Sequence, residues 1–194
     1  MARQYFNSQL ADSLIVAASI TPTTTKTSIF TVAQANQAFP VGFGQSAPFA
    51  GQVYEFQMGG LITTPATGTL IIDPYHGPGS SPTVFGTDMG ASPAQTVTAS
   101  LTSVPWIING CIVYRTISAA ATSSTAWLTG VFSSQGTLAT AGGGWSIPFG
   151  STAAVTVDTS GLSANLFGAL NFAVTFSVTG GTISAQWTSM KSLN

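Results

Sequence analysis

The chain has one histidine, His76, so any acid–base or metal chemistry that uses an imidazole depends on this residue. His76 lies in residues 73–79 (DPYHGPG), and a folded loop could bring Asp73 and the more distant Asp88 towards it. Pro and Gly at these positions are typical of turns, in which the Asp73 carboxylate accepts hydrogen bonds from backbone N–H groups. We therefore expect His76 to lie on an exposed loop and to have a structural role.

The other residue types that support catalysis are sparse. The carboxylates lie far apart in sequence, so no two are paired for hydrolysis, and no short ligand spacing predicts zinc or calcium. They are Asp12, Glu55, Asp73, Asp88 and Asp158. Cys111 is the only cysteine, which excludes a disulfide within the chain, and we expect it to be a small buried residue. A cross-strand pair of Glu55 and Arg115 would be structural. The sequence thus predicts no enzyme, no cofactor and no metal.

Two glycine-containing segments match known motifs in part. Residues 42–47 (GFGQSA) have the glycine spacing of a dinucleotide-binding turn, but Pro48 and Gly51 exclude the helix that would meet the phosphates. Residues 144–148 (GWSIP) lack the last glycine and the helix of a nucleophile elbow. Both segments are predicted to be loops.

Aromatic side chains are the remaining candidates, because they can stack on sugar rings. Trp127 and Trp187 alternate with polar residues, so we expect them in the core together with Trp106. Trp145 lies in a glycine-rich loop and is a candidate contact residue. Together with Tyr75 and His76 it would form the binding site of an alternative function, a tail-tip or secreted lectin-like module that binds glycans.

Short strands are predicted to carry these residues, since apolar and polar residues alternate repeatedly. The segments are 53–58, 69–72, 96–101, 106–117, 126–132, 153–157, 170–178 and 183–188. Gly180-Gly181 predicts a hairpin in which the last two strands pair, each with one buried face and one hydroxyl-lined face. Gly59-Gly60 predicts a bulge or bend, Asn109-Gly110 a turn or bulge, and a long loop runs from Asp73 to about Pro93.

About eight strands with almost no helix between them predict an all-β fold, a jelly-roll β-sandwich, with an immunoglobulin-type sandwich as the alternative. The sandwich domain is predicted at residues 51–194. Residues 1–50 are poorly patterned and are interpreted as an N-terminal arm, partly extended, that is ordered by lying on a partner. Within this arm, the segment from Tyr5 to Ala18 fits both an amphipathic helix and a strand.

Charge is the unusual property of the composition. Only 5% of the 194 residues are charged and the formal net charge is -1, whereas 44% are hydrophobic. The four basic residues, Arg3, Lys26, Arg115 and Lys191, are spread along the chain, so no nucleic acid partner is predicted. No apolar run approaches the length of a membrane-spanning helix, and we expect neither a membrane partner nor a classical export signal.

So few charges restrict what the surface can be. A free small domain keeps itself soluble with charges of both signs, and interface cores are depleted in charge. Two interpretations stay open: much of the surface is covered by other copies or partners in an assembly, or the protein has a hydroxyl-rich coat. The first interpretation is favoured.

From residue 51 onward four features occur in a fixed order. They are residues 51–60 (GQVYEFQMGG), residues 67–72 (TGTLII), residues 104–106 (VPW) followed by 112–116 (IVYRT), and the paired strands expected at 170–178 and 183–187. In this order they resemble the opening strand, second strand, Pro-Trp strand and closing hairpin of the tumour-necrosis-factor-like (TNF-like) jelly-roll proteins of tailed-phage virions. These are variously called decoration, cement or minor capsid proteins.

This resemblance implies a virion protein without catalytic residues. It implies a homotrimer on the capsid exterior, at threefold positions, that clamps neighbouring subunits of the phage major capsid protein and stabilises the head. Residues 1–50 resemble no motif and would reach across the capsid surface in such an assembly. A capsid decoration protein is therefore the expected function.

Overall fold

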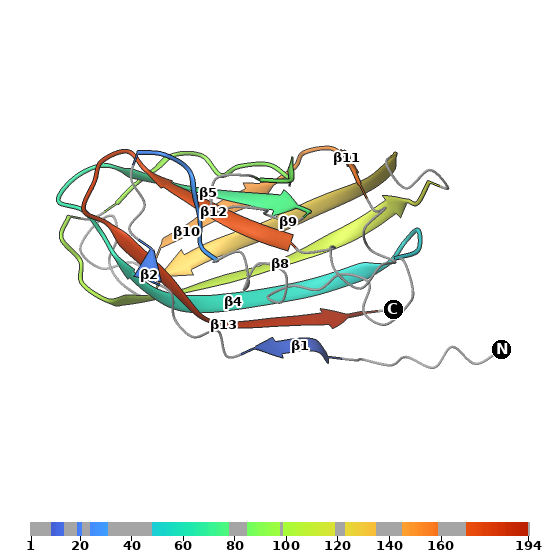
Figure 1. Cartoon of the computed structure of the whole chain (residues 1–194), viewed down its shortest axis with the longest axis horizontal. Coiled ribbons are helices and arrows are strands. Elements are labelled where there is room, and N and C mark those ends of the chain that lie inside the picture. The colour runs from blue at the N-terminus through green and yellow to red at the C-terminus, as the bar shows by residue number, and fades with distance from the viewer. Residues whose placement is uncertain are drawn as a thin grey trace.

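The computed structural model describes residues 9–13, 19–20, 24–30, 48–77, 85–97, 99–118, 123–134, 145–158 and 170–193. All regular structure in these ranges is strand, and no helix occurs in them (Figure 1). The strands are β1 Gln9–Ser13, β2 Ser19–Ile20, β3 Thr27–Ser28, β4 Val53–Thr63, β5 Thr69–His76, β6 Thr87–Asp88, β7 Gln95–Thr96, β8 Val104–Thr116, β9 Ser124–Ser134, β10 Trp145–Gly150, β11 Val155–Val157, β12 Leu170–Phe176 and β13 Thr182–Ser192.

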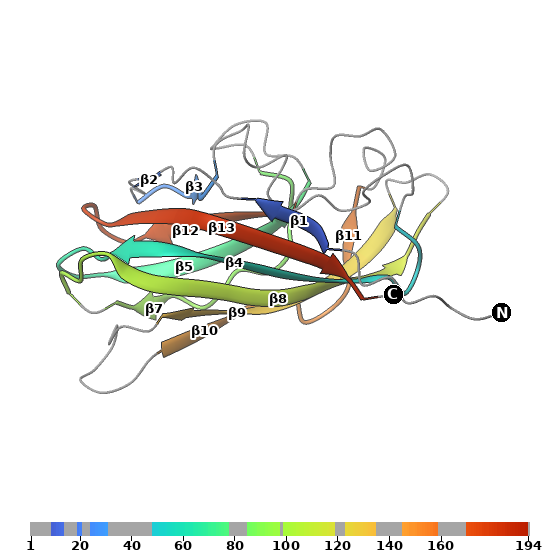
Figure 2. The same cartoon turned by 90° about the horizontal axis from the view of Figure 1, so that it is seen from below.

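These strands form two antiparallel sheets. The large sheet has the order β1-β13-β4-β8-β9-β10, with β11 paired to β9 and β2 paired to β13. The small sheet has the order β3-β12-β5-β6, with β7 paired to β5. The sheets lie face to face (Figures 1 and 2). The buried apolar side chains fill the space between them. The predicted all-β, two-sheet architecture is confirmed.

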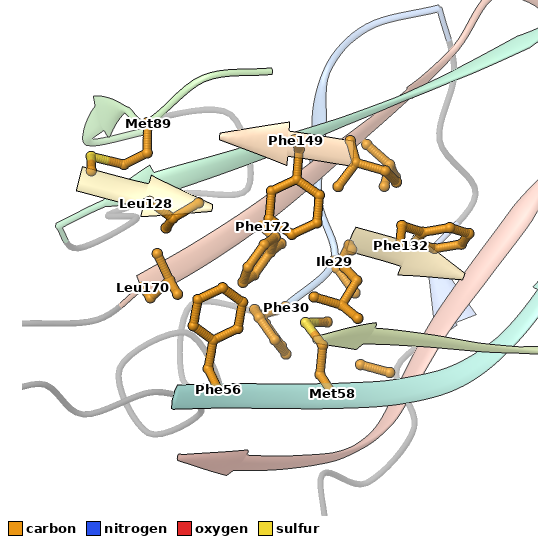
Figure 3. Packing of buried hydrophobic residues seen from close by; sticks show 14 of the residues in the cluster. Ile29, Phe30, Phe56, Met58, Met89, Leu128, Phe132, Phe149, Leu170 and Phe172 are labelled. Atoms are coloured by element: carbon orange, nitrogen blue, oxygen red, sulfur yellow. The ribbon is translucent and has the colours of Figure 1, made fainter. Parts of the chain in front are cut away.

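The core is made by alternate residues of the long strands, as the period of two predicts. Rings and aliphatic chains from both sheets meet in one cluster, in which Phe56 and Met58 of β4 face Phe172 of β12 (Figure 3). Gly110 makes room for this packing, because a Cβ at this position would lie 2.4 Å from the ring of Phe56. The turn predicted at Asn109-Gly110 is therefore wrong: β8 runs through both residues, and the glycine is needed for space rather than for a turn.

The bulge predicted at Gly59-Gly60 lies on the neighbouring strand. β4 is continuous, and the register of β13 shifts between Ala185 and Trp187, which face Gly60 and Gly59. A Cβ on Gly60 would lie 1.8 Å from the Ser184 carbonyl oxygen. Gly60 therefore accommodates the backbone of β13, and Gly59 accommodates the indole ring of Trp187, whose Nε1 would lie 2.7 Å from a Cβ there.

The hairpin predicted at Gly180-Gly181 is wrong. Gly180 does turn the chain, at φ 100°, but β12 and β13 belong to different sheets: β12 pairs with β5 and β3, while β13 pairs with β4. Alternation identifies the core-facing side chains of both strands but says nothing of which edge each strand joins. The expected hydroxyl-lined outer face of β12 is also wrong, because Asn171 and Ala173 are buried there.

The described parts of residues 1–50 take part in the sandwich. β3 pairs with β12, and β1 and β2 pair with β13. Ile29 and Phe30, directly after β3, are each 1% exposed and lie in the core cluster (Figure 3). Of the segment that fitted both helix and strand, residues 9–13 are a strand; residues 5–8 and 14–18 lie outside the described residues.

Candidate interaction surface

The predicted loop at Asp73 to Pro93 begins later than expected. Asp73 to His76 form the end of β5, which pairs with β12 on one side and with β6 on the other. Pro74 lies within the strand, and its carbonyl oxygen accepts the Met89 N–H at 2.9 Å. The turn begins at Gly77, with φ 110°. His76 is thus 2% exposed, and its expected place on an exposed loop is wrong.

His76 and Asp73, which were expected to approach each other, project from opposite faces of β5. His76 points between the sheets, where its Nε2 lies 2.7 Å from the Tyr114 hydroxyl of β8. Its Nδ1 is buried and has no hydrogen-bond partner among the described residues. Burial lowers the pKa of His76 to about 4, although the Asp158 carboxylate opposes the shift. The imidazole is therefore neutral near pH 7, and this geometry supports a packing role rather than acid–base catalysis.

Asp73 lies on the outer face of the small sheet, in a cluster with Lys26 and Tyr75. Lys26 Nζ lies 3.5 Å from Asp73 Oδ2 and also donates a hydrogen bond to the Tyr75 hydroxyl. Its ammonium group lies 4.9 Å from the centre of the Tyr75 ring, which stacks on Phe85 at 4.7 Å. Burial raises the pKa of Asp73, Lys26 lowers it, and the nearby Asp88 raises it further. This cluster joins residues near β3 to β5 across the small sheet.

On the large sheet, the predicted pair of Glu55 and Arg115 is not formed. The register places Glu55 opposite Cys111, and Glu55 instead makes a 2.6 Å ion pair with Lys191 of β13. Both side chains are about two-fifths exposed, at 40% and 43%, so solvent screens the pair. Cys111, expected to be buried, is half-buried beside this pair, and burial together with the Glu55 charge raises the pKa of its thiol.

The tryptophans divide between core and surface. Trp106 is buried and stacks on Phe132 with ring centroids 5.4 Å apart, as expected of a core residue. Trp127 and Trp187, also predicted to be core, are half-buried on the outer face of the large sheet. The loop predicted at residues 144–148 is wrong, because Trp145 begins the strand β10; the side chain of Trp145 lies outside the described residues, as do residues 42–47. Since Tyr75 and His76 are both buried, they form no exposed glycan site with it.

The outer surface of β4, β8 and β9 has few charged side chains. β4, β8 and β9 carry two charged residues between them, Glu55 and Arg115. The side chains that point outward include several half-exposed apolar groups: Val53, Leu61, Ile107, Val113, Trp127 and Val131. We call this outer surface of β4, β8 and β9 the open face. It is suited to contact with another apolar surface.

Two hollows mark the open face. One, of about 400 Å³, lies over the middle of β4, β8 and β9, between Glu55, Cys111 and Val131. It lies above Gly110 and Gly130, which pair across β8 and β9 and whose missing side chains admit Phe56 and Phe149 to the core beneath. The other, of about 500 Å³, lies at the end of the sheet beside Arg115 and Trp127.

Sequence reasoning missed the partners that these residues have. The two residues of each pair are separated by tens of residues or more, so no local spacing predicts the contact. The pairs are Lys26 with Asp73, Lys191 with Glu55, and Tyr114 with His76. The scarcity of charged residues was the one signal in the sequence for the open face. It predicts that part of the surface lacks charges but not which part.

Neither a metal cluster nor a membrane helix occurs among the described residues. No three His, Cys, Asp or Glu side chains gather there at distances that could hold an ion. No helix in the described ranges has the length and apolarity to cross a bilayer. In comparisons with known proteins, the chain matches no protein-family model and no curated protein.

Proposed function

We propose that this chain is a non-enzymatic structural protein of a phage virion, a decoration or cement protein of the capsid exterior. It forms a homotrimer and stabilises the head by binding the lattice of the major capsid protein. The observation that carries this proposal is the open face, a broad sheet surface with half-exposed apolar side chains and two charged residues, Glu55 and Arg115. Such a surface is costly to leave in water and favours burial against another protein.

The strand pairing supports the finer assignment of a jelly roll. A jelly roll is a long antiparallel ribbon rolled into two sheets, so its first strand pairs with its last, its second with its seventh, and so on inward. Here β1 pairs with β13, β3 with β12, β4 with β8, and β5 with β6. β9, β10 and β11 fall between the sixth and seventh strands of this scheme and extend the large sheet.

The TNF-like resemblance also implies a jelly roll, but it makes residues 51–60 the opening strand. In the scheme above β4 is the third strand, and residues before 51 supply the first two, β1 and β3. The resemblance places no catalytic group in the fold, and the geometry of the titratable residues agrees with that. His76 and Asp73 are buried on opposite faces of β5, and Glu55 is held by Lys191. These positions fit roles in stability and assembly.

A cement protein stabilises a capsid through the surface area that it buries against the capsid subunits. Burial of apolar surface contributes about 25 cal/mol per Å², and binding entropy offsets a large part of each contact. Copies that bridge neighbouring capsid subunits act together, because the lattice cannot loosen at one place without breaking several contacts. An uncharged contact surface suits this role, since its desolvation costs little.

The test of the proposal is the absolute mass of the full chain by light scattering during gel filtration. We expect a stable trimer at micromolar concentration. Val131→Lys places a charge in the centre of the open face and is expected to give monomers with an unchanged circular dichroism spectrum. Thr179→Lys, at the exposed turn before β13, is the matched control and keeps the trimer.

A wild-type chain that is monomeric at this concentration would overturn the trimer. A trimer that survives Val131→Lys would show that the open face is not the contact between copies. Binding to the capsid is tested separately, by sedimentation of the purified trimer with capsids that lack the protein. A trimer that does not co-sediment would overturn the cement role.

A further inference from the structure

A pocket at the end of the large sheet has the features of a ligand site. Its volume is about 500 Å³, and the described residues that line it are Arg115, Thr116, Trp127 and residues 152–154. It lies where β8 and β9 end and the segment between β10 and β11 passes over them. Pockets of this size hold small ligands of one or two ring units.

Arg115 lies at an irregularity in the sheet. Tyr114 pairs with Ala126 and Thr116 pairs with Thr125, so Arg115 is the extra residue of a β-bulge in β8. The alternation of β8 points Arg115 outward, and after the bulge Thr116 is exposed as well. Two successive side chains of β8 therefore line the pocket.

The charge of Arg115 is not used within the described part of the chain. Among the described cations, Lys26 pairs with Asp73 and Lys191 pairs with Glu55, whereas Arg115 makes no ion pair. None of the described residues that line the pocket is acidic. In a protein with so few charges, the pocket therefore offers a planar cationic group to an anion that must come from outside.

Trp127 supplies the second recognition element. Its indole Nε1 donates a 2.6 Å hydrogen bond to the Ser151 carbonyl oxygen, which fixes the orientation of the ring. The ring is half-buried, so part of its surface remains available in the pocket. A fixed, partly exposed ring binds the apolar C–H face of a cyclic ligand at little entropic cost.

We propose that this pocket binds a carboxylate-bearing sugar, such as a uronate or a sialate unit. Arg115 pairs with the carboxylate through two parallel hydrogen bonds, and Trp127 stacks on the sugar ring. Thr116 and Thr152 also line the pocket and offer hydroxyls to the sugar, although the Thr116 hydroxyl already shares a 2.8 Å hydrogen bond with that of Thr125. An acidic peptide would use Arg115 but would leave the ring of Trp127 without a matching face, so the sugar is the better fit.

This inference does not depend on the proposed capsid role. The pocket includes Trp127 of the open face, so a trimer contact at this end of the sheet would cover it. Titration of the Val131→Lys chain distinguishes a covered pocket from an absent one. Failure of sugar binding leaves the trimer test unaffected, and a monomeric chain can still bind the sugar.

Calorimetric titration of the full chain tests the proposal, with galacturonate oligomers and sialyllactose as acidic probes and with galactose oligomers and lactose as their neutral counterparts. We expect the acidic probes to bind at least about tenfold more tightly than the neutral ones, because the carboxylate pair supplies much of the affinity. Arg115→Gln and Trp127→Ala should each lose at least about tenfold in affinity. Lys191→Gln removes the same charge elsewhere on the large sheet and should bind as the wild type does.

Other results would overturn the proposal. They are no binding of any probe at millimolar concentration, equal binding of acidic and neutral probes, or unchanged affinity in Arg115→Gln. Displacement of the acidic sugar by an acetylated glutamate peptide of equal affinity would assign the pocket to a protein carboxylate instead. Circular dichroism and thermal unfolding of each variant distinguish a lost site from a lost fold.

Discussion

The outer faces of the two sheets differ in how far their side chains are exposed. On the small sheet, Asp73, Tyr75 and Asn171 point outward and are nevertheless buried, at 2%, 4% and 1% exposure. On the large sheet, outward residues such as Val131 stay exposed or half-exposed. Part of the outer face of the small sheet is therefore covered, in part by Lys26 and Phe85, whereas the outer face of the large sheet is more exposed.

An ion pair between a lysine and a carboxylate contributes differently to stability on the two faces. Lys26 and Asp73 pair over the small sheet, where the carboxylate is 3% exposed, and Lys191 and Glu55 pair on the open face, where both side chains are well solvated. A buried carboxylate needs its partner, whereas an exposed pair contributes little. The position of each ion pair therefore predicts its contribution to stability better than the number of ion pairs does.

The largest expected effect tests whether residues near β3 complete the core. Phe30→Ala removes a ring that is 1% exposed and should lower the free energy of unfolding by about 3–5 kcal/mol. Val131→Ala on the open face should change it by less than about 0.5 kcal/mol. Urea unfolding followed by tryptophan fluorescence measures both. Similar losses for the two variants would remove the distinction between the faces.

The next effect concerns β5, which is covered on both sides. The folded pKa of His76, about 4, lies below the value of 6.5 expected for an exposed histidine. Between these values the unfolded chain binds more protons than the folded one, so stability falls as the pH is lowered from about 6.5 to about 4.

The loss contributed by His76 should approach about 1.4 kcal/mol per pH unit in this window. Thermal unfolding between pH 7 and pH 4 measures it, and His76→Gln should flatten the profile relative to wild type. If the profile of His76→Gln runs parallel to that of wild type, the histidine is not buried as the structure has it.

The third prediction compares the two ion pairs directly. Lys26→Met leaves Asp73 buried without its cation and should cost about 2 kcal/mol near pH 7, less than for a fully buried pair because the side chain of Lys26 is 36% exposed. Lys191→Met should cost less than about 1 kcal/mol.

The pH dependence of Lys26→Met has a definite sign. Since burial raises the pKa of Asp73, the carboxyl takes up a proton more readily in the folded chain, and the cost of the missing lysine shrinks as the pH falls. Chemical unfolding of both variants at neutral and acid pH checks this. Equal costs for the two variants at neutral pH would contradict the difference between the faces.

The smallest effect uses Cys111 as a reporter of the open face. Burial and the Glu55 charge raise the pKa of its thiol, so alkylation by iodoacetamide near pH 8 should be slower than that of a free thiol. Glu55→Gln should speed the reaction by a small factor, and dilution that dissociates a trimer should speed it as well. A rate equal to that of a free thiol at all protein concentrations would show that nothing covers this part of the face.

The sequence by itself determined the fold class and the composition of the core. The alternation in residues 53–58, 106–117 and 126–132 divides the side chains of each strand between two faces, because successive side chains of a strand point to opposite faces. It did not decide which face of residues 126–132 is inward, since Trp127 was expected in the core and lies on the outer face. The scarcity of charge likewise determined that part of the surface would be apolar. Both are local or additive properties, so neither depends on which strand is adjacent to which.

Only the tertiary structure decided the pairings. Gly180-Gly181 is a good hairpin turn in isolation, yet β12 and β13 satisfy their hydrogen bonds with β5 and β4 in separate sheets. His76 lies in a sequence typical of turns, yet pairing with β12 and β6 on both sides keeps its strand extended. Burial on the small sheet, the partner of each charge and the bulge at Arg115 all arise from segments far apart in the chain. Their contacts are set by the closing of the two sheets around one core, which no short stretch of sequence can encode.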